Sequence, residues 1–423
     1  MLARALGLGL IMITMIGGSS GHLSSFTNPT VEYANPLDSL LHSTPALIPV
    51  VQHPDKYELQ VIYTRIDRDA ELKPHFTQYS YHLNDRAYFN PASLVKLPVA
   101  VLSLQKLNKL RQQAPVLSRQ TIMVTGAAGR CQTSVPFAAP ADSDRVASIG
   151  NYIKRMLLVS DNQAYNRLYE FLGQQYLHQE LGRLGYPSAR ITRRFAPCDT
   201  AANRCTNPIT FHSATGQALY QQPAACNPQR LTNPLGRVTK GRGYYAGGKL
   251  IERPYDFTTA NYLPLQATTD LLRTVLFPGS IHGRPDPALT TTDRAFLRYY
   301  LGATPAESGF RPFSSPSYFP SYKKYLYYGR HRQAQPEPGL RIYNIVGMSH
   351  GYLADCAYFT DQKSGAEFML SAVLYVNTDG ILNDGQYEYA SIGLPFLAEL
   401  GQAFYQLERR RPRQNRFIEG TAP

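Results

Sequence analysis

The sequence predicts an α+β fold, in which an antiparallel sheet is flanked by N- and C-terminal helices and an all-helical lobe is inserted between its strands. Two observations support this prediction. Strand-like runs lie near both ends of the chain, at residues 59–66, 75–82, 340–346, 353–360 and 367–376. Helical periodicity dominates between residues 146 and 184. Strands on both sides of a helical middle are typical of a sheet that pairs distant segments around a lobe.

The N-terminus has the pattern of a secretory signal over residues 1–21. Arg4 precedes an apolar run, residues 5–16, and a stretch of glycine and serine follows it. The run is too short to span a bilayer. No cysteine directly follows it, so the sequence does not indicate a lipoprotein anchor. No later segment offers 18 uninterrupted apolar residues. The sequence therefore predicts an exported protein, periplasmic or extracellular, without a transmembrane segment.

The rest of the chain divides into a leader, one folded domain and a tail. Residues 22–54 form a leader that contains proline and serine, with one short helix near residues 37–41. The domain spans residues 55–408. Two segments rich in glycine, proline and other loop-forming residues are expected to be irregular insertions, at about 205–263 and 278–338.

Three further helices are expected in this domain. An apolar run, residues 97–107, follows the turn-like Phe89-Asn90-Pro91, and a second helix covers residues 268–277. An amphipathic run, residues 392–408, closes the domain as a helix against the strands. A basic tail, residues 409–423, follows and is expected to be solvated.

The composition indicates a globular protein rather than a nucleic-acid-binding one. Of 423 residues, 43% are hydrophobic and 17% are charged, which suffices for a buried core. The net charge is +13, but the basic residues are dispersed and no zinc-finger, helix-turn-helix or RNA-binding pattern is present. We therefore expect no nucleic-acid partner, and a basic surface suited to anionic polymers or lipids.

Five cysteines fit an oxidising compartment and leave one thiol unpaired. The favoured bridge joins Cys198 to Cys205 across a short polar stretch, and Cys131 with Cys226 is the next choice. Cys356 lies in an apolar strand-like run and is expected to be a buried thiol. The histidines and cysteines show no metal-site spacing, so we expect neither a metal nor another cofactor.

Ser93-Leu94-Val95-Lys96 is a candidate nucleophile and base, because it begins an apolar helix. Residues three apart share a helix face, so the amine of Lys96 can reach the hydroxyl of Ser93. Apolar neighbours disfavour the charged amine, and a serine needs such a base to act as a nucleophile. Ser103-Leu104-Gln105-Lys106 repeats the spacing, but it lies mid-helix, where no free backbone N–H groups stabilise an oxyanion.

A second motif, Ser160-Asp161-Asn162, lies 67 residues after Ser93 and precedes a helical pattern. On its own it is a helix cap, since serine and aspartate are good N-cap residues. The order and spacing of the two motifs resemble those of the penicillin-recognising serine hydrolases, namely class A β-lactamases and penicillin-binding proteins. Their neighbours, Asn90-Pro91-Ala92 and Gln163-Ala164-Tyr165-Asn166, extend the resemblance, which covers roughly residues 57–408.

The resemblance implies a β-lactamase/transpeptidase-like fold and a mechanism. Ser93 is then the residue that is acylated, and Lys96 takes its proton. Ser160 relays a proton to the leaving nitrogen, and Asn162 contacts the substrate amide. The expected substrate is a β-lactam or a cell-wall peptide. We expect the protein to be a monomer.

The family's third element, Lys-Thr-Gly on an edge strand, is altered in this chain. We place it over Ile345-Val346-Gly347, and Ser349-His350-Gly351 is the alternative register. Gly347, Ser349 and His350 are therefore candidate substrate-binding residues beside Asn162. In the preferred register Ile345 replaces the lysine that meets a substrate carboxylate. The candidate replacement cations are His350, Lys323, Lys324 and Arg341; His350 is otherwise a loop residue without a role.

A second departure concerns hydrolysis of the acyl-enzyme. Class A enzymes carry an Arg-x-Glu-Pro-like run whose glutamate activates the deacylating water. Here Arg194-Phe195-Ala196-Pro197 resembles that run, with Ala196 in place of the acid. Asp199 is the nearest carboxylate, either as a substitute base or as the residue that begins a polar turn. Fast β-lactam hydrolysis is therefore not expected.

Three functions remain open from the sequence. The first is an exported serine hydrolase that forms an acyl-enzyme on amides or esters, in the manner of a β-lactamase. The second is a non-catalytic envelope-binding protein on the same fold, which the changes at Ile345 and Ala196 favour. The third is a peptidase or esterase that acts on cell-wall peptides or small esters.

Overall fold

The computed structural model describes residues 35–127, 131, 133–138, 143–313, 315–331 and 334–416. The predicted signal, the first part of the leader and residues 417–423 of the predicted tail lie outside the described residues. No helix in the described ranges combines the length and the apolar character needed to cross a membrane.

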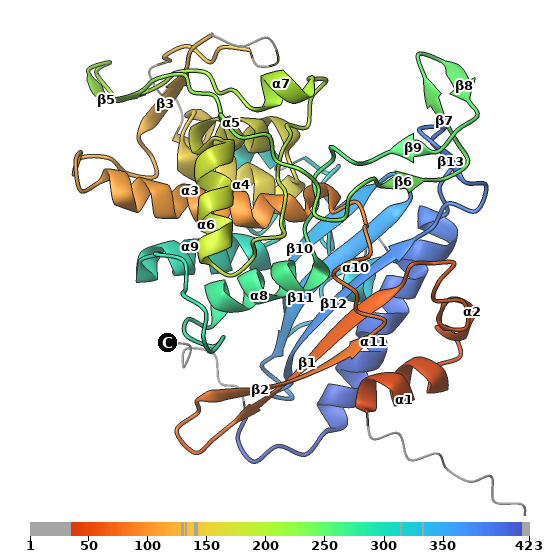
Figure 1. Cartoon of the computed structure of the whole chain (residues 1–423). Coiled ribbons are helices and arrows are strands. Elements are labelled where there is room, and N and C mark those ends of the chain that lie inside the picture. The colour runs from red at the N-terminus through yellow and green to blue at the C-terminus, as the bar shows by residue number, and fades with distance from the viewer. Residues whose placement is uncertain are drawn as a thin grey trace, which may run out of the picture. The chain divides into compact units, whose positions relative to one another are not determined.

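A five-stranded antiparallel sheet organises residues 35–416, which confirms the α+β prediction (Figure 1). Its order is β10-β11-β12-β1-β2. The strands are β1 (Gln60–Arg68), β2 (Pro74–Tyr81), β10 (Leu340–Ser349), β11 (Tyr352–Asp361) and β12 (Glu367–Tyr375). The two ends of the domain meet where β1 pairs with β12, with Gln60 opposite Val373. The sheet therefore joins the early and late strand-like runs, as the sequence predicts.

Alternation along β1 explains why helices pack on both sides of the sheet. Val61 and Tyr63 belong to a buried cluster with the C-terminal helix. Ile62 and Ile66 point the other way, into the cluster that continues through the helical lobe. Because side chains in a strand alternate between faces, one strand supplies both cores.

The helices that cover the first face come from the two ends of the described chain, and two of them lie in the predicted leader, whose residues therefore belong to the folded domain. They are α1 (Pro36–Ser43), α2 (Ile48–Val51) and α11 (Leu394–Arg410). The other face packs against α8 (Leu265–Leu276) and α9 (Thr291–Gly302). Beyond them lies the lobe of α3 (Lys96–Leu110), α4 (Ile149–Val159), α5 (Asn162–Leu172) and α6 (Gln174–Arg183).

The two segments expected to be irregular contain regular structure. The first holds six short strands, namely β4 (Ile209–His212), β5 (Ala218–Gln222), β6 (Thr239–Lys240), β7 (Gly243–Ala246), β8 (Lys249–Ile251) and β9 (Tyr255–Asp256). Some pair with distant chain, since β4 pairs with β3 (Ile122–Thr125) and β7 with β13 (Ile381–Leu382). Strands this short carry no readable alternation, so the sequence does not reveal them.

The second segment contains helix α9 and the short α10 (Tyr325–Tyr328). Helix α9 begins with a capping box, in which Thr290 and Asp293 satisfy each other's backbone N–H groups. This signal is visible in the sequence, and reading the whole segment as loop was wrong. Lys324 holds α10 to the sheet, because its Nζ donates to the carbonyl oxygen of Ile342 in β10 at 2.7 Å.

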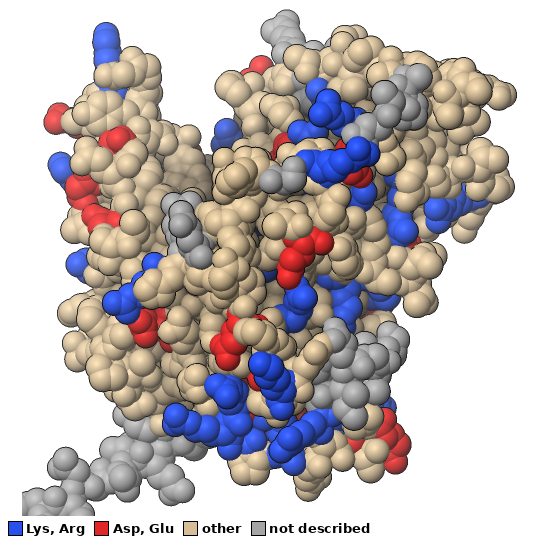
Figure 2. Space-filling view, turned by 180° about the vertical axis from the view of Figure 1, so that it is seen from behind, with Lys and Arg blue, Asp and Glu red and all other residues tan. Residues whose placement is uncertain are grey.

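Basic side chains are spread over the face drawn in Figure 2, with a concentration toward its lower edge. The described residues of the predicted tail are not simply solvated. Arg411 pairs with Asp67 and Glu408, and Arg413 also pairs with Glu408. Glu408 is fully buried, so its charge needs these cations.

The predicted disulfide pairing is wrong. The structure joins Cys131 to Cys198 and Cys205 to Cys226, with Cα–Cα distances of 5.4 and 4.0 Å. A helical turn, α7 (Thr200–Asn203), separates Cys198 from Cys205 and prevents the predicted bridge. Cys205 instead lies opposite Cys226 in an antiparallel bridge. Cys356 is a buried free thiol, as predicted.

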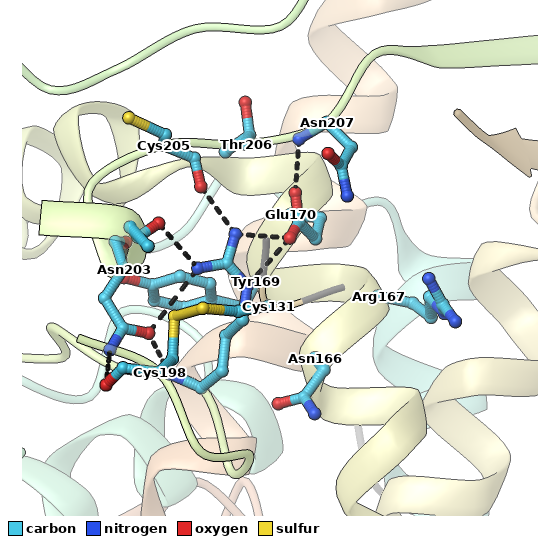
Figure 3. Close-up of polar contacts among 12 residues, drawn as sticks. Cys131, Asn166, Arg167, Tyr169, Glu170, Cys198, Asn203, Cys205, Thr206 and Asn207 are labelled. Carbon is cyan, nitrogen blue, oxygen red and sulfur yellow. Dashed lines mark hydrogen bonds and ion pairs between the residues drawn. A yellow bond between two sulfur atoms is a disulfide. The ribbon is translucent and has the colours of Figure 1, made fainter. Parts of the chain in front are cut away.

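A buried ion pair fixes the segment between α6 and α7. Arg194 on this segment pairs with Glu170 of α5, and their side chains are 3% and 0% exposed. The second carboxylate oxygen of Glu170 accepts from the amide of Asn207 at 2.6 Å, as Figure 3 shows. Arg194 also donates to the carbonyl oxygens of Ala202 and Cys205. The carboxylate of Glu170 thus connects α5 to the segment around Arg194 and to the segment around Asn207.

We expect Glu170→Gln to lower the free energy of unfolding by about 3–5 kcal/mol, because it leaves the buried charge of Arg194 without a counter-charge. Chemical denaturation followed by circular dichroism measures this loss. The control is Glu399→Gln, which breaks the exposed pair with Arg330 and should cost about 0–1 kcal/mol. Equal losses in the two variants would refute the stabilising role of the buried pair.

Candidate active site

Ser93 lies in a 3₁₀ turn, Ala92–Val95, directly before α3. The turn is held by Asn90, whose Oδ1 accepts from the amide of Ala92 at 2.9 Å. Gly347 of β10 lies against it, since a Cβ at this position would be 2.6 Å from the carbonyl oxygen of Pro91. Only glycine permits this approach. The serine is therefore held between the helical lobe and the edge strand.

Lys96 begins α3, and its side chain is fully buried. Its Nζ lies 2.8 Å from Ser93 Oγ, 2.9 Å from Ser160 Oγ and 2.7 Å from Asn162 Oδ1. It also contacts the carbonyl oxygen of Ser160. The four residues that the sequence singles out from its two motifs therefore meet at one amine.

Burial lowers the pKa of Lys96 to about 7, against the opposing effect of the negative charge of Asp161. Much of the amine is consequently neutral near pH 7. A neutral amine has a lone pair, which can accept the hydroxyl proton of Ser93. The geometry thus supplies a nucleophile with a base in direct contact.

Ser160 occupies the C-cap of α4 in the left-handed region, with φ of 59°. Such a conformation is strained for a residue other than glycine, and it places the side chain between two helices. Its hydroxyl donates to Ser93 Oγ at 2.7 Å. Asp161 caps α5 by accepting from the amides of Gln163 and Ala164, as its residue type predicts.

A cleft of about 460 Å³ gives access to Ser93. Of the predicted substrate-binding residues, Asn162, Ser349 and His350 line it. Gly347 does not line it, because it packs against the turn that carries Ser93.

His350 does not supply the missing cation at neutral pH. Burial, and to a smaller extent the positive charge of Arg193, lower its pKa to about 4. The Oδ1 of Asn90 accepts a hydrogen bond from the amide of Ala92, which fixes the orientation of the Asn90 side chain. Its Nδ2 then donates to Nδ1 of His350, at 3.1 Å. The imidazole therefore accepts through Nδ1 and carries its proton on Nε2.

Two of the other proposed cations face away from Ser93. Arg341 is exposed and pairs with Glu307 at 2.9 Å. Lys324 is buried and donates to Asn344 and to two carbonyl oxygens behind β10. Neither lines the cleft.

Lys323, the fourth proposed cation, lies near enough to Lys96 for their positive charges to interact. It is buried, and its Nζ donates to the carbonyl oxygen of Leu157, three residues before Ser160, at 2.7 Å. Burial and the positive charge of Lys96 both hold the pKa of Lys323 well below its usual range. Lys323 therefore supports the end of α4 from behind the cleft rather than lining it.

Arg193 is a cleft residue that sequence reasoning missed. It precedes Arg194, but only Arg194 pairs with Glu170, and no carboxylate in the described ranges forms an ion pair with Arg193. The sequence signal is the arginine pair itself. Both arginines line the cleft, but the charge of Arg194 is paired with Glu170, so the position of Glu170 in the folded lobe decides which arginine keeps an unpaired charge there.

No Asp or Glu is among the described residues that line the cleft. Ala196 lines it at the position where the resemblance places an acid. Asp199 does not line it, because its carboxylate caps α7 by accepting from the amide of Ala202 at 2.6 Å. Within the described part of the chain, therefore, no lining carboxylate is placed to act as a base on water in the cleft.

Comparisons with known proteins support the resemblance. Residues 65–233 match the sequence model of the beta-lactamase enzyme family. No curated protein matches the chain in sequence.

Three solved structures of β-lactamases are similar in outline. The β-lactamase from Burkholderia vietnamiensis is 17% identical in sequence with a TM-score of 0.45, and the match covers 90% of this chain and 100% of that one. The class A enzyme from Mycobacterium abscessus is 15% identical with a TM-score of 0.44, covering 88% and 97%. The one from Sphaerobacter thermophilus DSM 20745 is 11% identical with a TM-score of 0.44, covering 89% and 98%.

Ser93, Lys96, Ser160 and Asn162 all lie within residues 65–233, the stretch that matches the model of the beta-lactamase enzyme family.

Proposed function

We propose that this protein is an exported serine hydrolase that forms an acyl-enzyme on an amide or ester, including the amide of a β-lactam. Ser93 Oγ attacks the carbonyl carbon while its proton passes to the neutral Nζ of Lys96. Backbone N–H groups, including that of Ser93, stabilise the oxyanion. Ser160 relays the proton to the leaving nitrogen of an amide, or to the leaving oxygen of an ester, as its bond to the carbonyl carbon breaks. The product is an ester of Ser93, which water or another acceptor then cleaves.

One observation carries this proposal, namely the contact between a buried lysine of lowered pKa and two serine hydroxyls. An ordinary lysine would be charged at neutral pH and could not accept a proton. Burying an amine without a carboxylate partner costs stability, and the chain tolerates this cost at the point where a base is useful.

A second function, acyl transfer or slow hydrolysis on cell-wall peptides, is favoured by the cleft around Ala196. Since no Asp or Glu is among its described lining residues, water in the cleft lacks a carboxylate base. An acyl-enzyme would then persist until another nucleophile arrives. This candidate shares the acylation step with the first and differs in the fate of the ester.

We expect the purified protein to gain the mass of one acyl group when it is incubated with a reporter penicillin, and Ser93→Ala to gain none. Lys96→Met should acylate about 10²–10⁴-fold more slowly, the usual contribution of a general base. Intact-protein mass spectrometry over time measures both. If wild type forms no adduct with penicillins, esters or stem peptides, the non-catalytic binding function is correct instead.

Helix α3 offers matched controls, because Ser103 and Lys106 repeat the spacing of the motif. Burial lowers the pKa of Lys106 to about 7 as well, but its Nζ contacts Phe171 and Gln222 rather than a serine. Ser103→Ala and Lys106→Met should therefore still acylate. Loss of the adduct in folded samples of these variants would contradict the roles given to Ser93 and Lys96.

The acylation rate should depend on pH through Lys96. The neutral amine is the active form, so the rate should rise about tenfold per pH unit below the pKa of about 7 and level off above it. Stopped-flow acylation between pH 5 and 9 measures the profile. Lys106→Met should keep this profile, although Lys106 titrates in the same range. A wild-type profile that is flat across pH 7 would exclude Lys96 as the base.

Ala196→Glu should shorten the lifetime of the acyl-enzyme by about 10²-fold, because it adds a general base for water to the cleft. The lifetime is read by mass after excess acyl donor is removed. Asp199→Asn is the control and should leave the lifetime unchanged, because Asp199 caps α7. A much longer lifetime in Asp199→Asn would show that Asp199 is the deacylating base after all.

A further inference from the structure

A second cavity, of about 580 Å³, lies next to the catalytic cleft and has no place in the proposed reaction. It is bounded by the chain around α7 and by loops of residues 230–236 and 258–260, the yellow-green and green segments of Figure 1. Three arginines line it, namely Arg190, Arg204 and Arg230. No Asp or Glu is among its described lining residues.

Two of these arginines are held in place by neutral groups. Arg190 donates to the carbonyl oxygens of Thr232, Pro187 and Ala189, at 2.9, 2.6 and 2.8 Å. Neither it nor Arg204 forms an ion pair with a carboxylate in the described ranges. Carbonyl oxygens orient a guanidinium but leave its positive charge uncompensated, so these charges stand fixed at the cavity wall.

Arg204 is anchored in the same way, because its Nε and Nη2 donate to the carbonyl oxygen of Asn227 at 2.9 and 2.5 Å. Arg230 differs from both. Its side chain is exposed and forms no hydrogen bond with a residue in the described part of the chain. Thr200 and Thr232 also line the cavity. Two fixed arginines and one exposed arginine thus share one concave surface.

A thin wall separates this cavity from the cleft that holds Ser93. Ala260 lines both. The wall consists of two extended segments, in which Arg190 and Tyr262 exchange backbone hydrogen bonds of 2.7 Å. Asn261 fixes it further, since its Oδ1 accepts from the amide of Arg193 at 3.1 Å. The cavity is therefore a separate site with its own arginines, beside the cleft but not part of it.

We propose that this cavity binds a multiply charged oxyanion, carried by a phosphate-bearing or polycarboxylate ligand. Guanidinium groups pair bidentately with phosphate and carboxylate oxygens, and such charge-assisted hydrogen bonds are the strong ones. Three positive charges without a counter-charge require a ligand with more than one negative charge. The proposal does not depend on the catalytic function.

Isothermal titration calorimetry of the purified protein at about 20 mM salt tests the proposal, because low salt limits screening of exposed charges. The probes are inorganic pyrophosphate and citrate, which distinguish a phosphate from a carboxylate source. We expect one of them to bind with a one-to-one stoichiometry and a Kd below about 1 mM. If neither probe binds at concentrations up to about 10-fold above this Kd limit, the proposal is overturned.

Variants locate the binding. Arg230→Gln should weaken it about tenfold or more, the usual loss when a hydrogen bond to a charged group is removed. It should fold, because the Arg230 side chain is exposed and forms no hydrogen bond with a residue in the described part of the chain. Arg253→Gln is the matched control, since Arg253 is also exposed in the same segment but does not line the cavity. Equal weakening by both variants would mean that only net charge matters and would refute a defined site.

Arg193→Gln separates the two cavities, because Arg193 lines only the catalytic cleft. Binding that survives this variant and fails in Arg230→Gln supports the proposed site. Binding that fails in Arg193→Gln alone would place the anion in the catalytic cleft and overturn the proposal.

Discussion

The site is built around one buried amine. Lys96 has no carboxylate partner within ion-pair distance in the described chain, and its three side-chain contacts are two serine hydroxyls and an asparagine oxygen. Burial therefore sets its pKa near 7. This constraint explains the surrounding architecture, because the 3₁₀ turn, the end of α4 and the start of α5 must converge on one nitrogen. The left-handed conformation of Ser160 is part of that convergence.

A second buried charge holds the wall of the cleft. The Glu170–Arg194 pair ties α5 to the segment that carries Arg193 and Ala196, so a buried ion pair holds this part of the cleft wall. Both arginines line the cleft, and because the charge of Arg194 is paired with Glu170, Arg193 is the one without a carboxylate partner in the described ranges. With His350 neutral, this arginine rather than the edge-strand histidine is the cation that an anionic substrate would meet.

The two departures from the family pattern have different physical consequences. Ile345, which the preferred register places over the family's lysine, is buried in the core between sheet and lobe and does not line the cleft, whereas Ser349 and His350 of the alternative register do. Lys323 approaches the end of α4 from a different segment, but it does so behind the cleft. At Ala196 nothing compensates within the described lining of the cleft, and Asp199 is committed to a helix cap. The contacts of Lys96 with two serine hydroxyls thus support acylation, whereas no comparable contact in the described cleft supports deacylation.

The sequence by itself determined the α+β class, the strands at both ends, and the meeting of Ser93, Lys96, Ser160 and Asn162. The class and the strands depend on local periodicity, and the contact of Ser93 with Lys96 depends on helical spacing, all of which is readable along the chain. Ser160 and Asn162 join them through the resemblance that the two motifs carry. The tertiary structure alone decided the disulfide partners, the neutral state of His350 and which of Arg193 and Arg194 pairs with Glu170. It also decided the short strands of the first insertion and the arginine-lined cavity. Each of these depends on which distant segments become neighbours, and burial and pairing across space carry no local signal.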